Sequence, residues 1–461
     1  MFTLPEIFTV PLEYSAEERR LEYQGALAGQ EVAKLHYIPP AGTDRGDYAL
    51  MPGIMKHYRI EALIDRMAFV WVTHGYHAWK DIRTLLKSDL GDSCYVEAIN
   101  PEKGTHQISW PQVSDLLKQL EAEPSEVGRF FTIMVQTPDP DRLRRGFEKL
   151  QHRFRMDPEV PPGIVILEVA LDFHPRSSSP RERLALREQM VGLLQRHHHM
   201  EKLRHGENDW LAKCGFKTSQ SDARQVYAQG GGFSGTQTQR LFELSRSTLN
   251  KEPDTALLDP EVRERLLNPG GSKLFLDSTL YKGTEAGPLL IRIQHKITDE
   301  VNPTRGTKRD LPDDERRPRI EVVLKGRDFI SDQLGISTMP ELGSVKFRNL
   351  KTDFFRFWVS KTPSDPGLRE AVQEQLASRG VYGCDHHQRA LVAKDHLEKP
   401  TASAGSRTST RVPKGLLSPR ANITSWKECS EAVGDALDAL SKKWATFTFE
   451  VDEGEEKDDA A

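Results

Sequence analysis

Charged side chains interrupt segments of this chain that otherwise have the composition of buried β-strands. The segment LEVALDFHP contains Glu168 and Asp172, and the segment LLIRIQHK contains Arg292 and Lys296. Charged groups in strands this apolar cost free energy unless they are paired or used in a site. Carboxylates bind hard divalent cations through oxygen, and Arg and Lys neutralise phosphate. The pattern therefore indicates a site for a metal ion, a phosphate group or both.

Three segments show the same separation of apolar from charged positions, because side chains alternate between the two faces of a strand. On the charged face the positions are Glu168 and Asp172, then Arg292, Gln294 and Lys296, then Arg319, Glu321 and Lys325. One such strand is equally well explained as an edge strand with a wet face, whereas three favour a sheet whose concave polar face is a site. Glu168 and Asp172 lie about 13 Å apart along an ideal strand. A shared metal ion therefore needs a bulge, or a ligand from a neighbouring strand such as Glu321.

The elements that must hold these positions follow from the hydrophobic periodicity of the chain. Apolar and alternating runs predict strands at the beginning of 66–79 and at 128–137, 163–175, 273–283, 288–296 and 317–326. Helical spacing predicts helices at 109–123, 139–154, 179–206, 241–249 and 424–444. Elements in this order predict an α+β fold. We expect a mixed or antiparallel curved sheet with flanking helices, an extended N-terminal segment and a helical C-terminal appendage.

Composition divides the chain into further segments, because stretches rich in Pro, Gly, Ser and Thr are typical of linkers. The predicted segments are an N-terminal extension (1–60), an α+β domain with the charged strands (61–362), a helical region (363–398), a flexible linker (399–421), a C-terminal helix (422–449) and an acidic disordered tail (450–461).

Charge and composition restrict the class of protein. The chain has 461 residues and a formal net charge of −4, but the acidic tail holds seven acids and one lysine, which leaves 61 acids and 63 bases elsewhere. This slightly basic body permits nucleic-acid binding. The chain has no apolar run of about 18 residues, no secretory-signal pattern at its start, and four cysteines without a CxxC pair. We expect a cytoplasmic protein with no membrane partner, no disulfide framework and no zinc ribbon.

Two further motifs are weaker. The run RHHHM at 196–200 does not predict a metal site, because adjacent helical side chains point about 100° apart; it predicts a solvated or phosphate-facing helix. The glycine-rich segment AQGGGFSGTQ at 228–237 lacks the Gly-Lys-Ser/Thr ending of an ATP-binding loop, which argues against ATP binding.

The charged strands, taken in order, resemble a known family. The segments VILEVALDFH, STLYKGTEAGPLLIRIQHK and RPRIEVVLKG are similar to motifs of the replication initiation factor family. That family comprises rolling-circle plasmid and phage initiators and related relaxases of conjugative elements. Its motifs are R-I-D-L-A-x-D, T-x-Y-x-G, R-x-Y-x-K and R-x-E-x-x-L-K. The resemblance covers roughly 62–360, and about 45 residues carry it.

The resemblance implies an enzyme that binds a replication origin, as single-stranded or hairpin DNA, and nicks one strand. A tyrosine hydroxyl would attack the phosphodiester, and a divalent metal, Mg²⁺ or Mn²⁺, would polarise it. The implied metal ligands are Glu168, Asp172 and Glu321; the implied nucleophile is Tyr281, beside Gly283; and the implied DNA contacts are Lys282, Arg292, Lys296, Arg319 and Lys325. A host helicase and a second copy of the chain are the further partners to consider.

The departures from the family motifs leave alternatives open. The first acid is Glu168 instead of aspartate, Ile166 replaces an arginine, and Gln294 stands where the third motif has tyrosine. Glutamine cannot form a phosphodiester adduct. Either Tyr281 serves as the nucleophile, or the protein binds DNA on the same fold without cutting it. A third interpretation is a host-side interaction protein with charged termini as partner arms.

Overall fold

The computed structural model describes most of the chain between residues 54 and 360, together with shorter stretches on either side. The described residues are 8–14, 34–38, 49–50, 54–99, 124–125, 127–157, 160–198, 226–229, 274–277, 279–283, 288–302, 307–360, 373–374, 376–377, 380–381 and 423–450. The helices predicted at 109–123 and 241–249 lie outside these residues. Within them, no helix is both long enough and apolar enough to cross a membrane.

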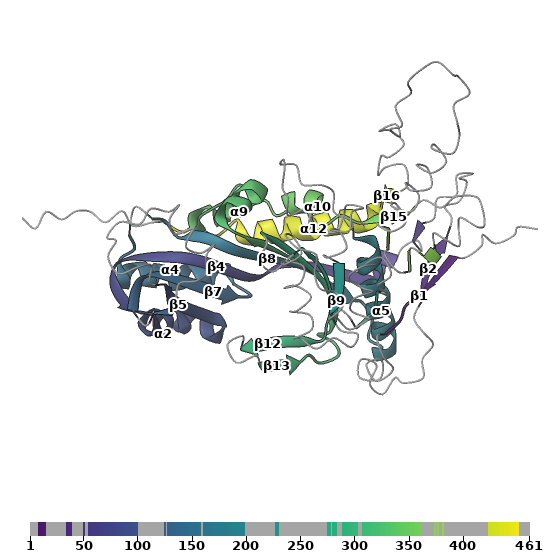
Figure 1. Cartoon of the computed structure of the whole chain (residues 1–461), viewed down its shortest axis with the longest axis horizontal. Coiled ribbons are helices and arrows are strands. Elements are labelled where there is room, and N and C mark those ends of the chain that lie inside the picture. The colour runs from purple at the N-terminus through teal and green to yellow at the C-terminus, as the bar shows by residue number, and fades with distance from the viewer. Residues whose placement is uncertain are drawn as a thin grey trace, which may run out of the picture.

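Nine strands of the described chain form one antiparallel sheet (Figure 1). In spatial order they are β6 (Pro124–Ser125), β5 (Cys94–Ile99), β7 (Val127–Gln136), β4 (Tyr58–Ala78), β8 (Gly163–Pro175), β14 (Arg317–Lys325), β11 (Leu289–Lys296), β10 (Thr279–Gly283) and β9 (Val226–Gln229). The predicted strands are therefore present, although the one expected at 273–283 is a strand only from Thr279 onward. Of the two expected sheet types, the structure has the antiparallel one. β4 begins earlier than the sequence indicated, at Tyr58, and continues for 21 residues.

Helices and smaller sheets accompany this sheet, which confirms the predicted α+β class. The helices are α2 (Trp79–Leu90), α4 (Pro140–Phe154), α5 (Pro180–His197), α9 (Arg327–Leu334), α10 (Asn349–Asp353) and α12 (Lys427–Trp444), with 3₁₀ turns at Ile54–His57, Gly91–Ser93 and Met339–Ser344. Small sheets pair β1 (Phe8–Pro11), β2 (Lys34–Ile38) and β3 (Ala49–Leu50), then β12 (Thr298–Asn302) with β13 (Thr307–Asp310), and β15 (Trp358–Ser360) with β16 (Ile423–Ser425).

Local sequence explains why α4 and α5 begin where they do. The side chain of Asp139 accepts a hydrogen bond from the backbone N–H of Arg142 at 3.1 Å, and Pro140 fills the first turn of α4. Ser179 caps α5 in the same way. Short polar side chains at these positions satisfy N–H groups that the helix itself leaves unpaired.

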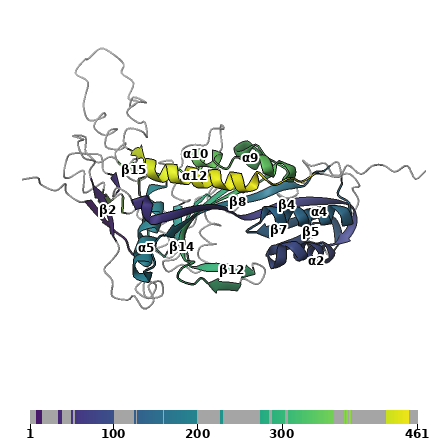
Figure 2. The ribbon, with the colours of Figure 1, turned by 180° about the vertical axis from the view of Figure 1, so that it is seen from behind.

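One face of the sheet carries the hydrophobic core. Leu167, Val169 and Leu171 of β8 point to this face and are fully buried, as are the matching positions of β11 and β14. Figures 1 and 2 show α12 lying along the sheet, where it packs on β4. Trp71 of β4 contacts Phe147 of α4 edge-to-face, with ring centroids 5.3 Å apart. The core face is therefore covered by helices, and the charged side chains are left to the opposite face.

The histidine run at the end of α5 is buried, so the prediction of a solvated or phosphate-facing helix there is wrong for residues 196–198. His197 donates to the carbonyl of Trp358 and accepts from the hydroxyl of Tyr37, both at 2.7 Å. His198 donates to the carbonyl of Phe354 at 2.7 Å. These imidazoles satisfy backbone and hydroxyl groups inside the core. Sequence periodicity does not reveal this, because helix and strand segments from both ends of the chain surround the helix end.

Candidate functional site

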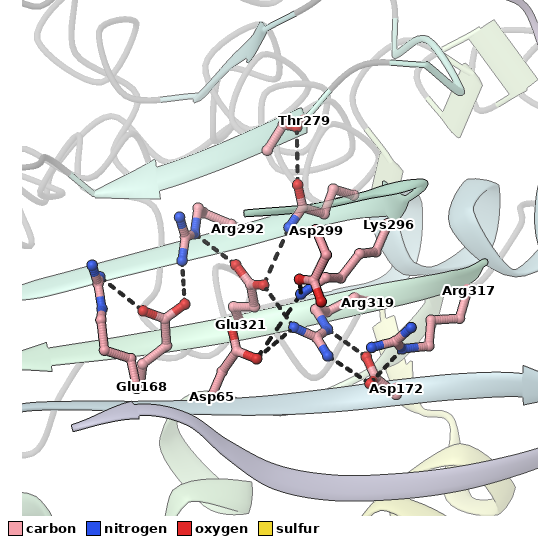
Figure 3. Close-up of polar contacts among 12 residues, drawn as sticks. Asp65, Glu168, Asp172, Thr279, Arg292, Lys296, Asp299, Arg317, Arg319 and Glu321 are labelled. Atoms are coloured by element: carbon pink, nitrogen blue, oxygen red, sulfur yellow. Dashed lines mark hydrogen bonds and ion pairs between the residues drawn. The ribbon is translucent and has the colours of Figure 1, made fainter. Parts of the chain in front are cut away.

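The charged positions of β8, β11 and β14 converge on one face of the sheet, as the strand alternation predicted. In the register, Arg292 lies opposite Glu321, and Arg319 lies opposite both Asp172 and Gln294. We call the resulting network the charged cluster (Figure 3). It consists of Asp65, Arg66, Glu168, Asp172, Arg292, Gln294, Lys296, Asp299, Arg317, Arg319 and Glu321.

Arg319 is the centre of the charged cluster. Its guanidinium binds Asp172 through two nitrogens, at 2.5 and 2.6 Å. A further nitrogen donates to Asp65 at 2.9 Å and to Glu321 at 3.3 Å. Arg317 adds a second guanidinium to Asp172 at 2.6 Å. Arg319 is only 1% exposed, so this charge depends on its carboxylate partners for the interactions that it loses with water.

Asp65 of β4 belongs to the charged cluster although the strand motifs did not include it. The pairing of β4 with β8 shifts register between Ile64 and Arg66, which leaves Asp65 as the extra residue of a β-bulge. A bulge re-aims side chains that strict alternation would send to opposite faces. Asp65 and Arg66 consequently both reach the cluster, where Asp65 meets Arg319 and Arg66 meets Glu168 at 2.8 Å. Two adjacent charged residues inside an apolar strand were the only sequence signal of this arrangement.

Glu168 lies between two arginines. One carboxylate oxygen pairs with Arg66, and the other accepts from Arg292. Arg292 also pairs with Glu321, with nitrogen and oxygen 2.7 Å apart. The two arginine side chains remain about 30% exposed, whereas Glu168 is buried. The guanidinium groups therefore lie at the boundary between the buried acids and the surface.

Gln294, which was expected from the sequence to replace a motif tyrosine, is part of the network. Its amide nitrogen donates to Glu321 at 3.2 Å, and its amide oxygen accepts from the hydroxyl of Thr279 at 3.4 Å. A glutamine can complete this chain of hydrogen bonds, because its amide both donates and accepts. It supplies no nucleophile.

Burial and opposite charge act against each other on the carboxyl groups. Burial acts to raise the pKa of Asp172, but the charges of Arg319 and Arg317 outweigh it and hold this pKa below its usual range. For Glu168, burial dominates and raises the pKa, although Arg292 opposes the shift. The pKa of Arg319 rises well above its ordinary value, because Asp172 and Asp65 outweigh the opposing effect of burial. The charged cluster contains equal numbers of acidic and basic residues, five of each.

Three carboxylate oxygens, one each from Asp65, Glu168 and Glu321, lie within 4.8 Å of one another. This donor set suits a hard cation such as Mg²⁺ or Mn²⁺. Each of the three acids also pairs with an arginine, so a cation would have to exchange with guanidinium nitrogens. Asp172, an expected ligand, lies outside this group and pairs with Arg317 and Arg319. The expected metal role of Glu168 and Glu321 stays a prediction.

The structure gives less detail on the remaining expected site residues. Tyr281 is the cross-strand partner of Arg292, and Lys282 is paired with Ile291; the side chains of Tyr281 and Lys282 lie outside the described part of the chain. Lys296 pairs with Asp299 at 2.9 Å. Lys325, at the last position of β14, is half-buried, and its N–H donates to the carbonyl of Pro288.

Comparisons with known proteins identify no relative. No protein-family model matches the chain. No curated protein and no solved structure matches it either. Any function must therefore be argued from the geometry of the charged cluster and from the strand motifs.

Proposed function

We propose that the protein is a DNA-binding protein of the rolling-circle initiator type, which holds one strand against the charged cluster and nicks it. The observation that carries the proposal is the convergence of arginines and carboxylates from four strands on one face. Arg66 and Arg292 are partly exposed, and each is already oriented by buried Glu168. Oriented guanidinium groups bind phosphate oxygens with little loss of side-chain freedom.

The proposed chemistry uses a tyrosine and the carboxylate group. Tyr281 stands in register with Arg292, so its hydroxyl is the proposed nucleophile. Its oxygen would bond to phosphorus, the bond to the 3′ oxygen would break, and a 5′-phosphotyrosine and a 3′-hydroxyl would result. Asp65, Glu168 and Glu321 would hold a divalent cation, which supplies polarisation of the phosphate when bound. The proton that the tyrosine hydroxyl loses ends on the departing 3′ oxygen, so the step needs no other proton source.

The test is a nicking assay on single-stranded and hairpin oligonucleotides with Mg²⁺ or Mn²⁺. Covalent attachment of DNA to the chain is measured on denaturing gels. We expect an adduct with the native chain and none with Tyr281→Phe. Tyr95→Phe, on β5 at the other side of the sheet, serves as the matched control and should retain the adduct. An adduct that persists in Tyr281→Phe would reject this nucleophile.

A second candidate function is DNA binding without cleavage. The observation that favours it is the bonding of Gln294 to Glu321, together with the arginines that already pair with each acid. In this case the native chain binds a hairpin oligonucleotide with the same affinity as Tyr281→Phe, and no adduct forms with any divalent cation. Binding without an adduct separates this candidate from the first.

A further inference from the structure

One acid of the charged cluster comes from outside the large sheet. Asp299 lies on β12, which forms a separate two-stranded hairpin with β13 on the side of the sheet opposite α12 (Figures 1 and 2). Its carboxylate is 2.9 Å from the ammonium group of Lys296 on β11 (Figure 3). This ion pair therefore joins the hairpin to the charged cluster.

Asp299 differs from most other acids of the charged cluster in its exposure. Its side chain is 46% exposed, whereas those of Glu168, Asp172 and Glu321 are 2% or 3% exposed. The arginines of the cluster pair with these buried acids, so their partners are held in place by the strands. Lys296 instead has an exposed acid as its closer partner. An exposed ion pair is worth little free energy, so it exchanges readily for another.

A phosphate group would compete with Asp299 for Lys296, because an ammonium group binds the oxygens of either anion. The side chain of Lys296 is only 11% exposed, so its charge needs an anion beside it whether DNA is bound or not. The other acid near it, Asp65, is 4.0 Å away and already accepts a hydrogen bond from Arg319. Asp299 is therefore the closer counter-ion of Lys296 in the free protein.

The hairpin offers Asp299 a second cation. Asp299 lies directly opposite Arg309 in the register of β12 and β13. Residues in such positions of an antiparallel pair have Cβ atoms about 4.5–5.5 Å apart, which lets opposite charges pair. The guanidinium of Arg309 is 62% exposed and lies 3.7 Å from Glu315, in the turn before β14. On leaving Lys296, Asp299 can thus pair with Arg309, so two alternative ion pairs are open to it.

We propose that Asp299 is a built-in competitor of DNA: it holds Lys296 in the free protein, and a phosphate of the bound strand displaces it. The inference rests on the proposed function in taking single-stranded DNA as the ligand, and it adds a form of autoinhibition to the same site. Binding then includes the exchange of one carboxylate for one phosphate at Lys296. A change that removes the carboxylate charge of Asp299 strengthens DNA binding.

The test measures binding of a fluorescent oligo(dT) of about 15 nucleotides, a length within the usual range of single-strand sites, with circular dichroism as the check on folding. Asp299→Asn should bind up to about 5-fold more tightly, the fold-change that corresponds to one exposed ion pair. Asp310→Asn is the matched control, because Asp310 is exposed on β13 opposite Thr298 and loses the same charge. It should bind almost like the native chain. Lys296→Gln should weaken binding and reduce the slope of log affinity against log salt by about 0.7.

A double-mutant cycle decides whether Asp299 acts through Lys296. Asp299→Asn added to Lys296→Gln should give no further gain in affinity. An equal gain with and without Lys296 would overturn the inference, because it would be an effect of net charge alone. Equal gains from Asp299→Asn and Asp310→Asn would overturn it for the same reason, and so would native affinity in Asp299→Asn.

Arg292→Gln and the nicking assay separate this inference from the proposed function. If Arg292→Gln weakens binding, the native chain forms an adduct and Asp299→Asn binds like the native chain, the inference is rejected and the proposed function stands. If Asp299→Asn binds more tightly through Lys296 but no adduct forms with any divalent cation, the inference stands and the nicking activity is rejected. An absence of binding at low salt, where phosphate contacts are strongest, rejects both.

Discussion

Replacement of Arg319 by methionine tests whether the charged cluster is a buried and mutually dependent network. The guanidinium of Arg319 makes two bonds to Asp172 and one each to Asp65 and Glu321. In Arg319→Met, Asp65 retains Lys296 at 4.0 Å, and Asp172 retains its neighbouring arginine. The charged cluster is then left with five acids and four bases, and an uncompensated buried charge of this kind costs about 3–5 kcal/mol. We expect the free energy of unfolding to fall by this amount.

Urea unfolding followed by circular dichroism at neutral pH measures the change. Arg59→Met is the matched control: Arg59 lies on the same sheet and pairs with Glu61 at 2.8 Å, but it is 58% exposed. An exposed ion pair is worth about 0–1 kcal/mol, so the control should unfold almost like the native chain. Adding Asp172→Asn to Arg319→Met leaves four acids and four bases in the charged cluster, which restores its charge balance and should recover part of the loss. The reasoning is refuted if Arg319→Met costs no more than Arg59→Met.

Three further changes have defined outcomes. Burial holds the pKa of His197 at about 4 in the folded chain, against about 6.5 in the unfolded chain. The contribution of neutral His197 to the free energy of unfolding is therefore fully present above pH 6.5 and falls by about 3 kcal/mol as the pH drops to 4. Urea unfolding across this pH range measures the change. Gly343→Ala would place its Cβ 2.2 Å from the carbonyl oxygen of Phe447, so we expect a loss of roughly 1–3 kcal/mol in thermal unfolding. Glu168→Gln removes a charged ligand of the proposed cation and should abolish the DNA adduct in the nicking assay.

Each of these changes has a control within the chain. His197→Asn should reduce the dependence of unfolding on pH between 6.5 and 4, leaving the part due to other buried groups; an unchanged dependence would contradict the assignment. At Gly75 an added Cβ would make ordinary contacts of 3.6 Å, so Gly75→Ala should be tolerated where Gly343→Ala is not. Glu61→Gln, on the exposed part of β4, should retain the adduct that Glu168→Gln loses.

The strands of the charged cluster were predictable because strand alternation is a local property of the chain. Arg292 and Glu321 share the polar face in the sequence pattern and lie opposite each other in the sheet. Asp65 was not predictable, because the bulge that turns it toward Arg319 depends on the pairing of β4 with β8. A register shift is set by the neighbouring strand, and no pattern within β4 alone contains it.

The burial of the histidines at the end of α5 could not be predicted from the sequence for a related reason. Arg196 and His197 have the composition of a solvated helix end, yet Arg196 donates to the carbonyls of Ala377 and Leu274 at 3.0 and 3.4 Å. Burial lowers the pKa of Arg196 to about 10. Polar side chains that serve the carbonyls of distant segments can be recognised only once those segments are in place.

The central claim is that the charged face of β8, β11 and β14 receives a DNA strand. Photocrosslinking of a single-stranded oligonucleotide containing 4-thiothymidine, followed by mass spectrometry of the crosslinked peptides, locates the contact directly. The account predicts crosslinks within β10 and β11, next to Arg292. Crosslinks confined to other surfaces, such as the exposed face of α12, would contradict it.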